Sequence, residues 1–339
     1  MPRSKPRPSL ARRPRSAPVY RSTTWTRRGS TSAMSASNRI LADVASILRI
    51  HIILIAVTAA LTFGWLFTGA FPWGIAVIGG IDWLLINLLN RVTDLKEDLA
   101  NEIRGTERLV GTQRLVLGLW LGVFAGSFAV SHLVWPQLTP WRAAVQLIGV
   151  GYSYRIVPTP AGLKRFKDLY FFKNFMSSVL FIHTVFLYPL VAADWRVIHP
   201  GGAAAVVLLA VFFVTFEITY EILYDMRDLE GDRLANVPTY PVVHGLHRSR
   251  QIIDGLLAAS AVTLLAALLS GVIGVREGLM LAAPAIQLVF YRPRYRRGLT
   301  TGDCIGLTYL GAGLLVFFLV GTQLWLAAGM PANIYLWPG

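Results

Sequence analysis

The sequence predicts an all-α membrane protein that crosses the bilayer about nine times. Hydrophobic residues make up 54% of the chain and charged residues only 15%, whereas soluble domains carry nearer a quarter charged residues. Apolar runs of about 20 residues recur along the chain, and each is long enough to cross the hydrocarbon layer as a helix. Basic residues gather in alternate loops between these runs. Together these observations predict a polytopic membrane protein.

Residues 1–40 precede the first apolar run and are expected to form a disordered basic tail. They contain ten Lys or Arg residues and no Asp or Glu. A segment of this composition cannot bury enough apolar surface to fold. The first apolar run is longer than the core of a signal peptide, so we interpret it as an uncleaved span. The transmembrane domain is therefore predicted over residues 41–339.

Nine candidate spans follow the tail. The fourth and the eighth are the weakest, because they are short or polar at one end. The predicted spans lie near 46–70, 72–90, 113–134, 141–157, 174–194, 202–224, 251–274, 278–291 and 304–328.

The basic residues predict how these spans are oriented. The loops expected outside carry only Arg142, Arg196 and Arg276, whereas the opposite loops are rich in Lys and Arg. Cytoplasmic loops of membrane proteins show this excess. We therefore expect the N-terminus and the long, active-site loops on the cytoplasmic side of the cell membrane. These inner loops lie at 91–114, 155–173, 225–250 and 292–297.

Several other classes of protein and site are disfavoured. The net charge of +14 follows the membrane topology, so we expect membrane lipid and no nucleic acid as a partner. The single cysteine, Cys304, excludes an internal disulfide and a multi-cysteine metal site. The six histidines are scattered and show no zinc-binding spacing.

Two acidic stretches follow the second and sixth predicted spans and are expected on the inner face. At about 100° per residue, Asn90, Asp94 and Asp98 fall within an arc of roughly 80° on a helix. By the same arithmetic Glu221, Asp225, Asp228 and Asp232 fall within roughly 60°. Carboxylates on one helix face repel each other, so a cation is expected between them. Magnesium bound to a diphosphate fits, because Mg²⁺ is usually shared between carboxylates and substrate phosphates.

Two further acidic residues lie within the predicted spans themselves. Asp82 is in the second span, and Glu217 lies one turn before Glu221. Charged side chains inside a membrane usually face a cavity or pair with a partner. Both interpretations stay open from the sequence: Asp82 and Glu217 line a pocket that leads to the acidic stretches, or they form hydrogen bonds inside the bundle.

These stretches resemble the two aspartate-rich motifs of the UbiA superfamily of intramembrane prenyltransferases. Asn90-x-x-x-Asp94-x-x-x-Asp98 is similar to the first motif. The sequence from Glu221 through Asp225, Asp228 and Asp232 to Arg233, followed by Thr239-x-Pro241 and Gly245, is similar to the second. The resemblance covers the chain from about residue 40 to its end.

The resemblance implies nine helices around a central cavity. It implies transfer of a prenyl group from an allylic polyprenyl diphosphate to a lipophilic acceptor, with Mg²⁺ as cofactor. Carried over by position, the implied metal ligands are Asn90, Asp94, Asp98, Asp225, Asp228 and Asp232, and the five aspartates among them are the implied catalytic residues. Asn90 and Glu221 are also expected to bind substrate.

Basic and aromatic residues near the motifs complete the expected site. Family members place a Tyr-Ser and a following Lys after the fourth span, which Tyr152-Ser153 and Lys164-Arg165 resemble. Positive side chains would neutralise charge that builds on the departing diphosphate. The candidates for this role are Lys164, Arg165, Lys167, Arg292 and Arg294.

The sequence leaves the acceptor open. An aromatic acceptor is the first expectation. The alternatives in the same fold are a chlorin alcohol, a glycerol phosphate, a carotenoid, or phosphoribosyl transfer to a polyprenyl phosphate. A cation-coupled transporter is the rival from another class, but such proteins usually bind ions near the middle of the bilayer in broken helices. Here the acidic stretches lie at the ends of spans.

Overall fold

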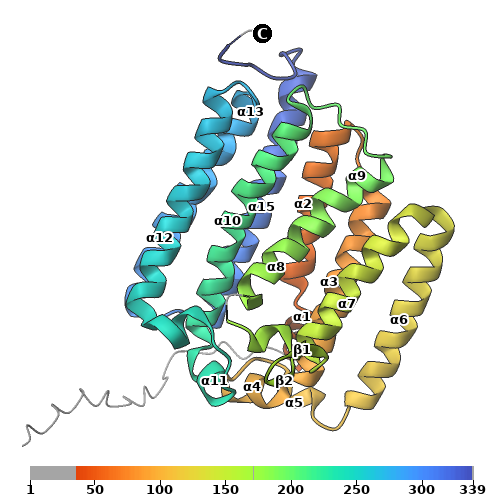
Figure 1. Ribbon diagram of the computed structural model, residues 1–339, viewed down its shortest axis with the longest axis vertical. Coiled ribbons are helices and arrows are strands. Elements are labelled where there is room, and N and C mark those ends of the chain that lie inside the picture. Colours follow the sequence, from red (N-terminus) through yellow and green to blue (C-terminus); the bar gives the residue numbers. More distant parts are fainter. Residues whose placement is uncertain (1–35, 171, 338–339) are drawn as a thin grey trace, which may run out of the picture.

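The computed structural model describes residues 36–170 and 172–337. Its long helices stand side by side, and the short elements that follow α3 and α10 gather at one end of the bundle (Figure 1). We call this end the motif end. It contains α4 (Leu95–Ala100), α11 (Leu229–Leu234) and a hairpin of β1 (Val157–Thr159) and β2 (Gly162–Lys164).

Seven helices of the described residues are long and apolar enough to cross a membrane. They correspond to seven of the predicted spans and make the chain a multi-pass membrane protein. They are α2 (Ile50–Thr68), α3 (Trp73–Thr93), α6 (Gln113–Val134), the continuous helix Phe172–Ala192, α10 (Gly202–Arg227), α12 (Tyr240–Leu269) and α15 (Thr301–Ala327).

The fourth and eighth predicted spans are helical but short. They form α7 (Thr139–Ser153) and α14 (Ala282–Arg297), of 15 and 16 residues. The count of nine spans is therefore not confirmed, although α7 packs against α3, and α14 packs against α12 and α15.

The remaining elements are short connections and caps. The continuous helix Phe172–Ala192 consists of α8 (Phe172–Ile182), the π-helical segment η3 (His183–Leu187) and α9 (Tyr188–Ala192). The others are α1 (Ala36–Ile47), α5 (Thr106–Leu109), η1 (Pro136–Leu138), η2 (Phe166–Asp168), α13 (Val275–Gly278) and η4 (Leu279–Leu281).

Two predicted boundaries differ from the structure. Helix α1 begins at Ala36, inside the predicted tail, while residues 1–35 of that tail lie outside the described residues. The predicted inner loop 292–297 is instead the last part of α14, which ends at Gly298 with a φ of 89°. Arginine favours helices almost as strongly as alanine, and a glycine at positive φ is a common helix stop.

Apolar packing at the centre of the bundle joins α2, η3 and α10. The Phe63 ring lies 4.4 Å from Phe186 and 4.9 Å from Phe213, measured between ring centroids. All three side chains are buried. Helix α6 is different, because little of it is buried and its leucines, such as Leu119 and Leu133, are exposed at its surface. This surface suits contact with lipid.

The structure resolves the open question about Asp82. Its carboxylate is buried and accepts hydrogen bonds from Arg142 at 2.6 and 3.0 Å, from Tyr188 at 2.9 Å and from Gln146 at 3.0 Å. Asp82 therefore joins α3, α7 and α9 inside the bundle. Arg142, which was predicted to lie in an outer loop, is fully buried in α7. Arg142 is buried here because its guanidinium group neutralises the buried carboxylate of Asp82.

Candidate active site

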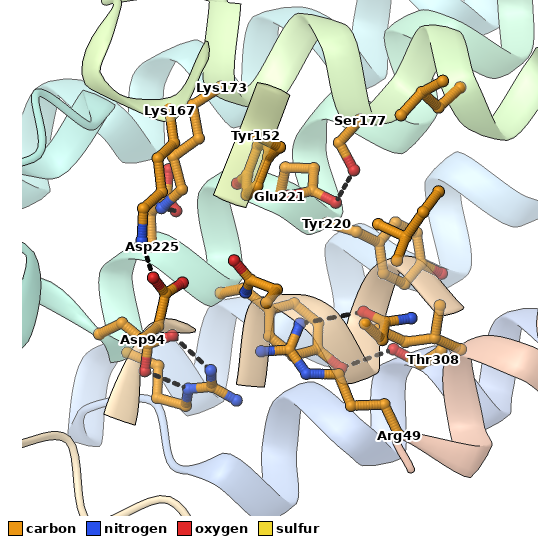
Figure 2. Close-up of a pocket in the computed structure, with 18 of the residues that line it drawn as sticks. Arg49, Asp94, Tyr152, Lys167, Lys173, Ser177, Tyr220, Glu221, Asp225 and Thr308 are labelled. Carbon is orange, nitrogen blue, oxygen red and sulfur yellow. Dashed lines mark hydrogen bonds and ion pairs between the residues drawn. The ribbon is translucent and has the colours of Figure 1, made fainter. Parts of the chain in front are cut away.

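A polar cavity of about 160 Å³ lies between the helices next to the motif end. Acidic side chains from both motifs line it, and so do Asn90, Lys167 and Lys173. Figure 2 shows Lys167 and Asp94 pointing toward each other, with Glu221 and Ser177 forming another bonded pair nearby. The deeper wall is apolar and includes Ile86, Trp83 and Phe181.

The two acidic motifs share one backbone arrangement. Asp94 separates α3 from the six-residue α4, and Asp228 separates α10 from the six-residue α11. The i to i−4 hydrogen bonds continue across both breaks: Asp98 N donates to Asp94 O at 2.9 Å, and Asp232 N donates to Asp228 O at 3.0 Å. Each motif therefore keeps a nearly helical register, as the sequence predicted.

A side-chain contact joins the two motifs at their ends. Asn101 follows α4, and its Oδ1 accepts a hydrogen bond of 2.9 Å from the backbone N of Gly231 in α11. A Cβ atom at Gly231 would lie only 2.3 Å from the Asn101 amide. Position 231 therefore requires glycine, because the α11 backbone must approach Asn101 closely.

Two basic residues bind the first motif: Arg165, which lies between β2 and η2, and Lys167 of η2. Lys167 Nζ lies 2.5 Å from Asp94 Oδ1 and 2.7 Å from Glu97 Oε2. Arg165 lies 3.4 Å from both of these acidic residues and binds Asp168 at 2.8 Å. Burial opposes ionisation of Asp168, but its hydrogen bonds from Arg165 outweigh burial and lower its pKa.

The start of α8 binds the second motif. Lys173 pairs with Asp225 and lies 3.4 Å from Asp232. The other oxygen of Asp225 accepts a hydrogen bond of 2.7 Å from Asn174. Burial of Asp232 raises its pKa to about 6, although the charge of Lys173 acts in the opposite direction. The carboxylates of this motif are thus crowded and largely removed from water.

Two predicted metal ligands bind arginines of their own motifs. Asp98 Oδ2 lies 2.5 Å from a guanidinium nitrogen of the buried Arg91. Asp228 is held by Arg227, whose Nε lies 2.7 Å from its Oδ1. Both carboxylates reach the cavity, each with a guanidinium partner.

The structure brings most of the predicted site residues to the cavity, but not all of them. The lining residues among them are Asn90, Asp94, Asp98, Tyr152, Lys167, Glu221, Asp225, Asp228 and Asp232. Arg165 reaches the cavity only through Asp94 and Glu97. Lys164 lies in β2, and Arg292 of α14 binds Asp254 at 3.2 Å; neither lines the cavity.

Several polar lining residues were not selected from the sequence. Arg49 lies between α1 and α2 with a φ of 48°, and its side chain donates a 3.2 Å hydrogen bond to Asn87. Lys173 was counted only as a loop residue, and Thr308 comes from the distant α15, where it bonds Tyr224 at 2.9 Å. A basic residue just before a long apolar run was the only available signal for Arg49 and Lys173.

The donor atoms at this cavity suit a hard cation. Asn90 Oδ1 is buried and makes no hydrogen bond to any described residue, so an amide oxygen stands beside carboxylates without a partner. Oxygen ligands of this kind are those that Mg²⁺ prefers. No group of three or more His, Cys, Asp or Glu side chains within residues 36–170 and 172–337 is already clustered as a metal site. The carboxylates of the two motifs pair with lysine and arginine side chains instead.

The fold and this cavity define a helical membrane protein with a charged site between two acidic helix ends. Residues 47–303 match the UbiA prenyltransferase family. The chain belongs to this family, which confirms the resemblance seen in the two motifs.

Solved structures show the same fold at low sequence identity. A UbiA homolog from Archaeoglobus fulgidus bound to GPP and Mg²⁺ is 16% identical, with a TM-score of 0.61, and the match covers 82% of this chain and 98% of that one. An apo UbiA homolog from Aeropyrum pernix K1 is 13% identical, with a TM-score of 0.58, covering 81% and 98%. No curated protein matches the sequence significantly.

Proposed function

We propose that this protein transfers a prenyl group from an allylic polyprenyl diphosphate to a lipophilic acceptor, with Mg²⁺ as cofactor. The observation that carries the proposal is the pair of matching acidic motifs at one cavity, each with a lysine between its carboxylates. Such a site offers both cation-binding and anion-binding groups, as a metal–diphosphate complex requires. The similar Archaeoglobus fulgidus structure, bound to GPP and Mg²⁺, supports the same ligands here.

The residues divide into those that hold the metal and those that hold the diphosphate. Asn90, Asp94 and Asp98 of the first motif and Asp225, Asp228 and Asp232 of the second would hold Mg²⁺. When bound, Mg²⁺ would neutralise charge on the diphosphate oxygens. Lys167 and Lys173 are placed to exchange their carboxylate partners for diphosphate oxygens, and Arg49 lines the same cavity.

The apolar wall would protect the reacting carbon. Loss of diphosphate leaves an allylic cation, which water would destroy. Trp83 and Phe181 line the cavity beyond the charged groups, and aromatic faces stabilise positive charge. Exclusion of water there also strengthens the electrostatic contacts of the lysines with the departing anion.

The orientation and the acceptor are part of the proposal. The distribution of basic residues supports a motif end on the cytoplasmic side, where a water-soluble diphosphate group is accessible. An aromatic acceptor remains our first expectation.

Radiolabel transfer in vesicles tests the reaction. Purified protein in phosphatidylcholine vesicles would receive labelled allylic diphosphates of several chain lengths, a lipid extract and candidate phenols, with Mg²⁺ or with chelator. We expect a labelled lipophilic product only with Mg²⁺. Asp94→Asn removes one carboxylate charge and should lower the rate by about a hundredfold or more.

Glu107→Gln is the matched control, because Glu107 is exposed on α5. It should retain full activity. Undiminished turnover in folded Asp94→Asn protein would contradict the assigned site. If the vesicles instead showed Mg²⁺ flux across the membrane and no diphosphate binding, the proposal would be wrong and the protein would be a cation transporter.

A further inference from the structure

A group of arginines next to the motif end has no role in the candidate active site. They come from the neighbouring ends of α12 and α14, two helices that pack against each other. None of them lines the polar cavity. The group consists of Arg248 and Arg250 of α12 and of Arg292, Arg294, Arg296 and Arg297 of α14.

Only half of these arginines have a carboxylate partner. The paired members bind two aspartates: Arg292 lies 3.2 Å from Asp254, and Arg294 and Arg297 lie 3.3 and 2.6 Å from Asp303.

The other three arginines, Arg248, Arg250 and Arg296, form no ion pair with any residue in the ranges 36–170 and 172–337. The residues outside these ranges include no Asp or Glu, so they cannot supply a carboxylate partner either. We call these three residues the basic patch. Its charge is left for a partner from outside the chain.

Arg296 continues the lipid-facing side of α14. Ala282, Ala285 and Val289 are exposed along one side of this helix, and Val289 is 74% exposed. Arg296 follows Val289 by seven residues, so the two side chains lie within about 20° of each other and about 10 Å apart along the helix axis. The apolar residues suit contact with lipid chains, and Arg296 therefore lies where the head groups begin.

Arg248 has the same relation to α12. Gly255, Ala259 and Val262 are exposed along one side of α12. Arg248 precedes Val262 by fourteen residues and lies within about 40° of it around the helix. Helix α12 stands at the edge of the bundle, on the side opposite α6 (Figure 1), which suits contact with lipid.

Arg250 lies between the two helices. Its guanidinium carbon is 5.8 Å from the centre of the Tyr295 ring of α14, a distance at which a cation is attracted to an aromatic face. Its Nε atom is buried and makes no hydrogen bond to any described residue. A buried donor of this kind is unfavourable until an acceptor bonds it, and an anionic oxygen would be such an acceptor.

We propose that the basic patch binds the phosphate group of an anionic phospholipid, whose acyl chains lie along the exposed sides of α12 and α14. Arginine binds phosphate through paired hydrogen bonds, and basic pockets between membrane helices bind anionic head groups. A zwitterionic lipid has the same phosphate, but the arginines would repel its ammonium group. This site is independent of the proposed prenyl transfer.

Photolabelling in nanodiscs tests this site. The full chain would be placed in phosphatidylcholine nanodiscs with a trace of phosphatidylglycerol or of phosphatidylcholine, either of which carries a diazirine near the head group. Labelled peptides would be produced with chymotrypsin, because arginine substitutions do not alter its cleavage sites, and identified by mass spectrometry. We expect the phosphatidylglycerol probe to label the neighbouring ends of α12 and α14 about tenfold more than the phosphatidylcholine probe.

A patch variant combines Arg248→Gln, Arg250→Gln and Arg296→Gln. It should label equally with the two probes, and Arg296→Gln alone should reduce the preference for phosphatidylglycerol severalfold. An excess of inorganic phosphate should leave the preference of the wild type unchanged, because the acyl chains hold the lipid at the site. Unfolding midpoints in phosphatidylcholine nanodiscs without a probe show whether each variant is folded.

The matched control removes three charges from exposed arginines outside the patch: Arg39→Gln, Arg114→Gln and Arg155→Gln. It should keep the full preference for phosphatidylglycerol. Equal labelling of the wild type by the two probes would overturn the proposal. So would an equal loss of preference in the control and the patch variant, since the effect would then come from overall charge. Displacement of the lipid probe by inorganic phosphate would identify a site for free phosphate instead.

Discussion

Lys167 and Lys173 each lie between two carboxylates of one acidic motif. Lys167 comes from η2 and binds Asp94 and Glu97, while Lys173 comes from α8 and binds Asp225 and Asp232. A single ammonium group between two carboxylates offsets their mutual repulsion. The two lysines therefore hold the carboxylates of each motif together, and their charges lie at the proposed diphosphate site.

Glu277 belongs to a second buried ionic group, which lies away from the polar cavity in α13. Its Oε1 lies 2.6 Å from Arg276 Nε and 3.5 Å from His199 Nε2. Its Oε2 accepts hydrogen bonds from Asn333 at 2.5 Å and from the backbone N of Gly274 at 2.9 Å. Burial alone would raise the pKa of Glu277, but these partners outweigh burial and lower it to about 2.

This pKa predicts how stability depends on pH. The folded pKa is below the ordinary value of 4.5, so ionised Glu277 stabilises the folded state above that value, by an amount on the order of 3 kcal/mol. The contribution is lost as the pH falls from about 4.5 toward about 2. Glu277→Gln should therefore unfold at a lower temperature than the wild type at neutral pH, and the difference should shrink in acid.

Thermal unfolding in detergent between about pH 7 and about pH 3 measures this effect. The exposed Glu107→Gln variant is the control and should follow the wild type at every pH. A temperature difference between Glu277→Gln and the wild type that stays constant over the whole range would contradict the assigned pKa.

At the scale of elements, each acidic motif is a long helix, one aspartate and a six-residue helix. This arrangement turns the chain at the bundle end while it keeps the carboxylates on one face. The hydrogen bond between Asn101 and Gly231 then fixes α4 against α11. The two motifs face each other because these short helices pack together, not because the long helices alone require it.

Helix α12 carries a local bend close to its N-terminus. Gly245 lies inside the helix with a φ of 76° and a ψ of 164°, a conformation that is nearly restricted to glycine. Gly245→Ala should therefore destabilise the protein by about 1–3 kcal/mol. Gly255→Ala in the same helix should stabilise it by about 0.5–1 kcal/mol, because Gly255 has ordinary helical geometry and open surroundings.

The unfolding midpoints of these two alanine variants, measured in detergent, test both predicted changes in stability. The two shifts should have opposite signs. If Gly245→Ala were as stable as the wild type, the bend would not be required by the fold.

At the scale of the whole molecule, the buried Asp82–Arg142 pair ties several helices together. Arg142 also donates hydrogen bonds to Ser131 Oγ at 2.6 Å and to Ser127 O at 2.8 Å, both in α6. The peripheral α6 is thus attached by polar contacts as well as by apolar packing. In a membrane such contacts matter because the hydrophobic effect does not drive helices together within the hydrocarbon layer.

Removal of one partner should be far more harmful than removal of both charges. Arg142→Met leaves the Asp82 carboxylate buried without its cation, and it should cost about 3–5 kcal/mol of stability. The combined Asp82→Asn and Arg142→Met variant should recover much of this loss, because the introduced amide oxygen would still accept hydrogen bonds from Tyr188 and Gln146. Detergent unfolding of both variants measures the difference; equal losses would show that the ion pair itself is not the important contact.

The sequence determined the features that depend on local pattern. Apolar length predicted the spans, and helical periodicity placed Asn90, Asp94 and Asp98 on one face, as it did Asp225, Asp228 and Asp232. Seven of the predicted spans are confirmed among the described residues, because span length is set by the bilayer, and the motif residues lie as the helical repeat predicts. The motifs also led to the correct family.

The tertiary structure alone decided which distant residues meet. Lys173, Arg49 and Thr308 reach the polar cavity from three different helical regions, whereas Arg292 binds Asp254 away from it. It also decided that Asp82 has partners and that Glu217 has none among the described residues. Local sequence cannot supply this information, because the partner of a buried charge is chosen by the packing of whole helices, and that packing depends on the shape of every contact surface at once.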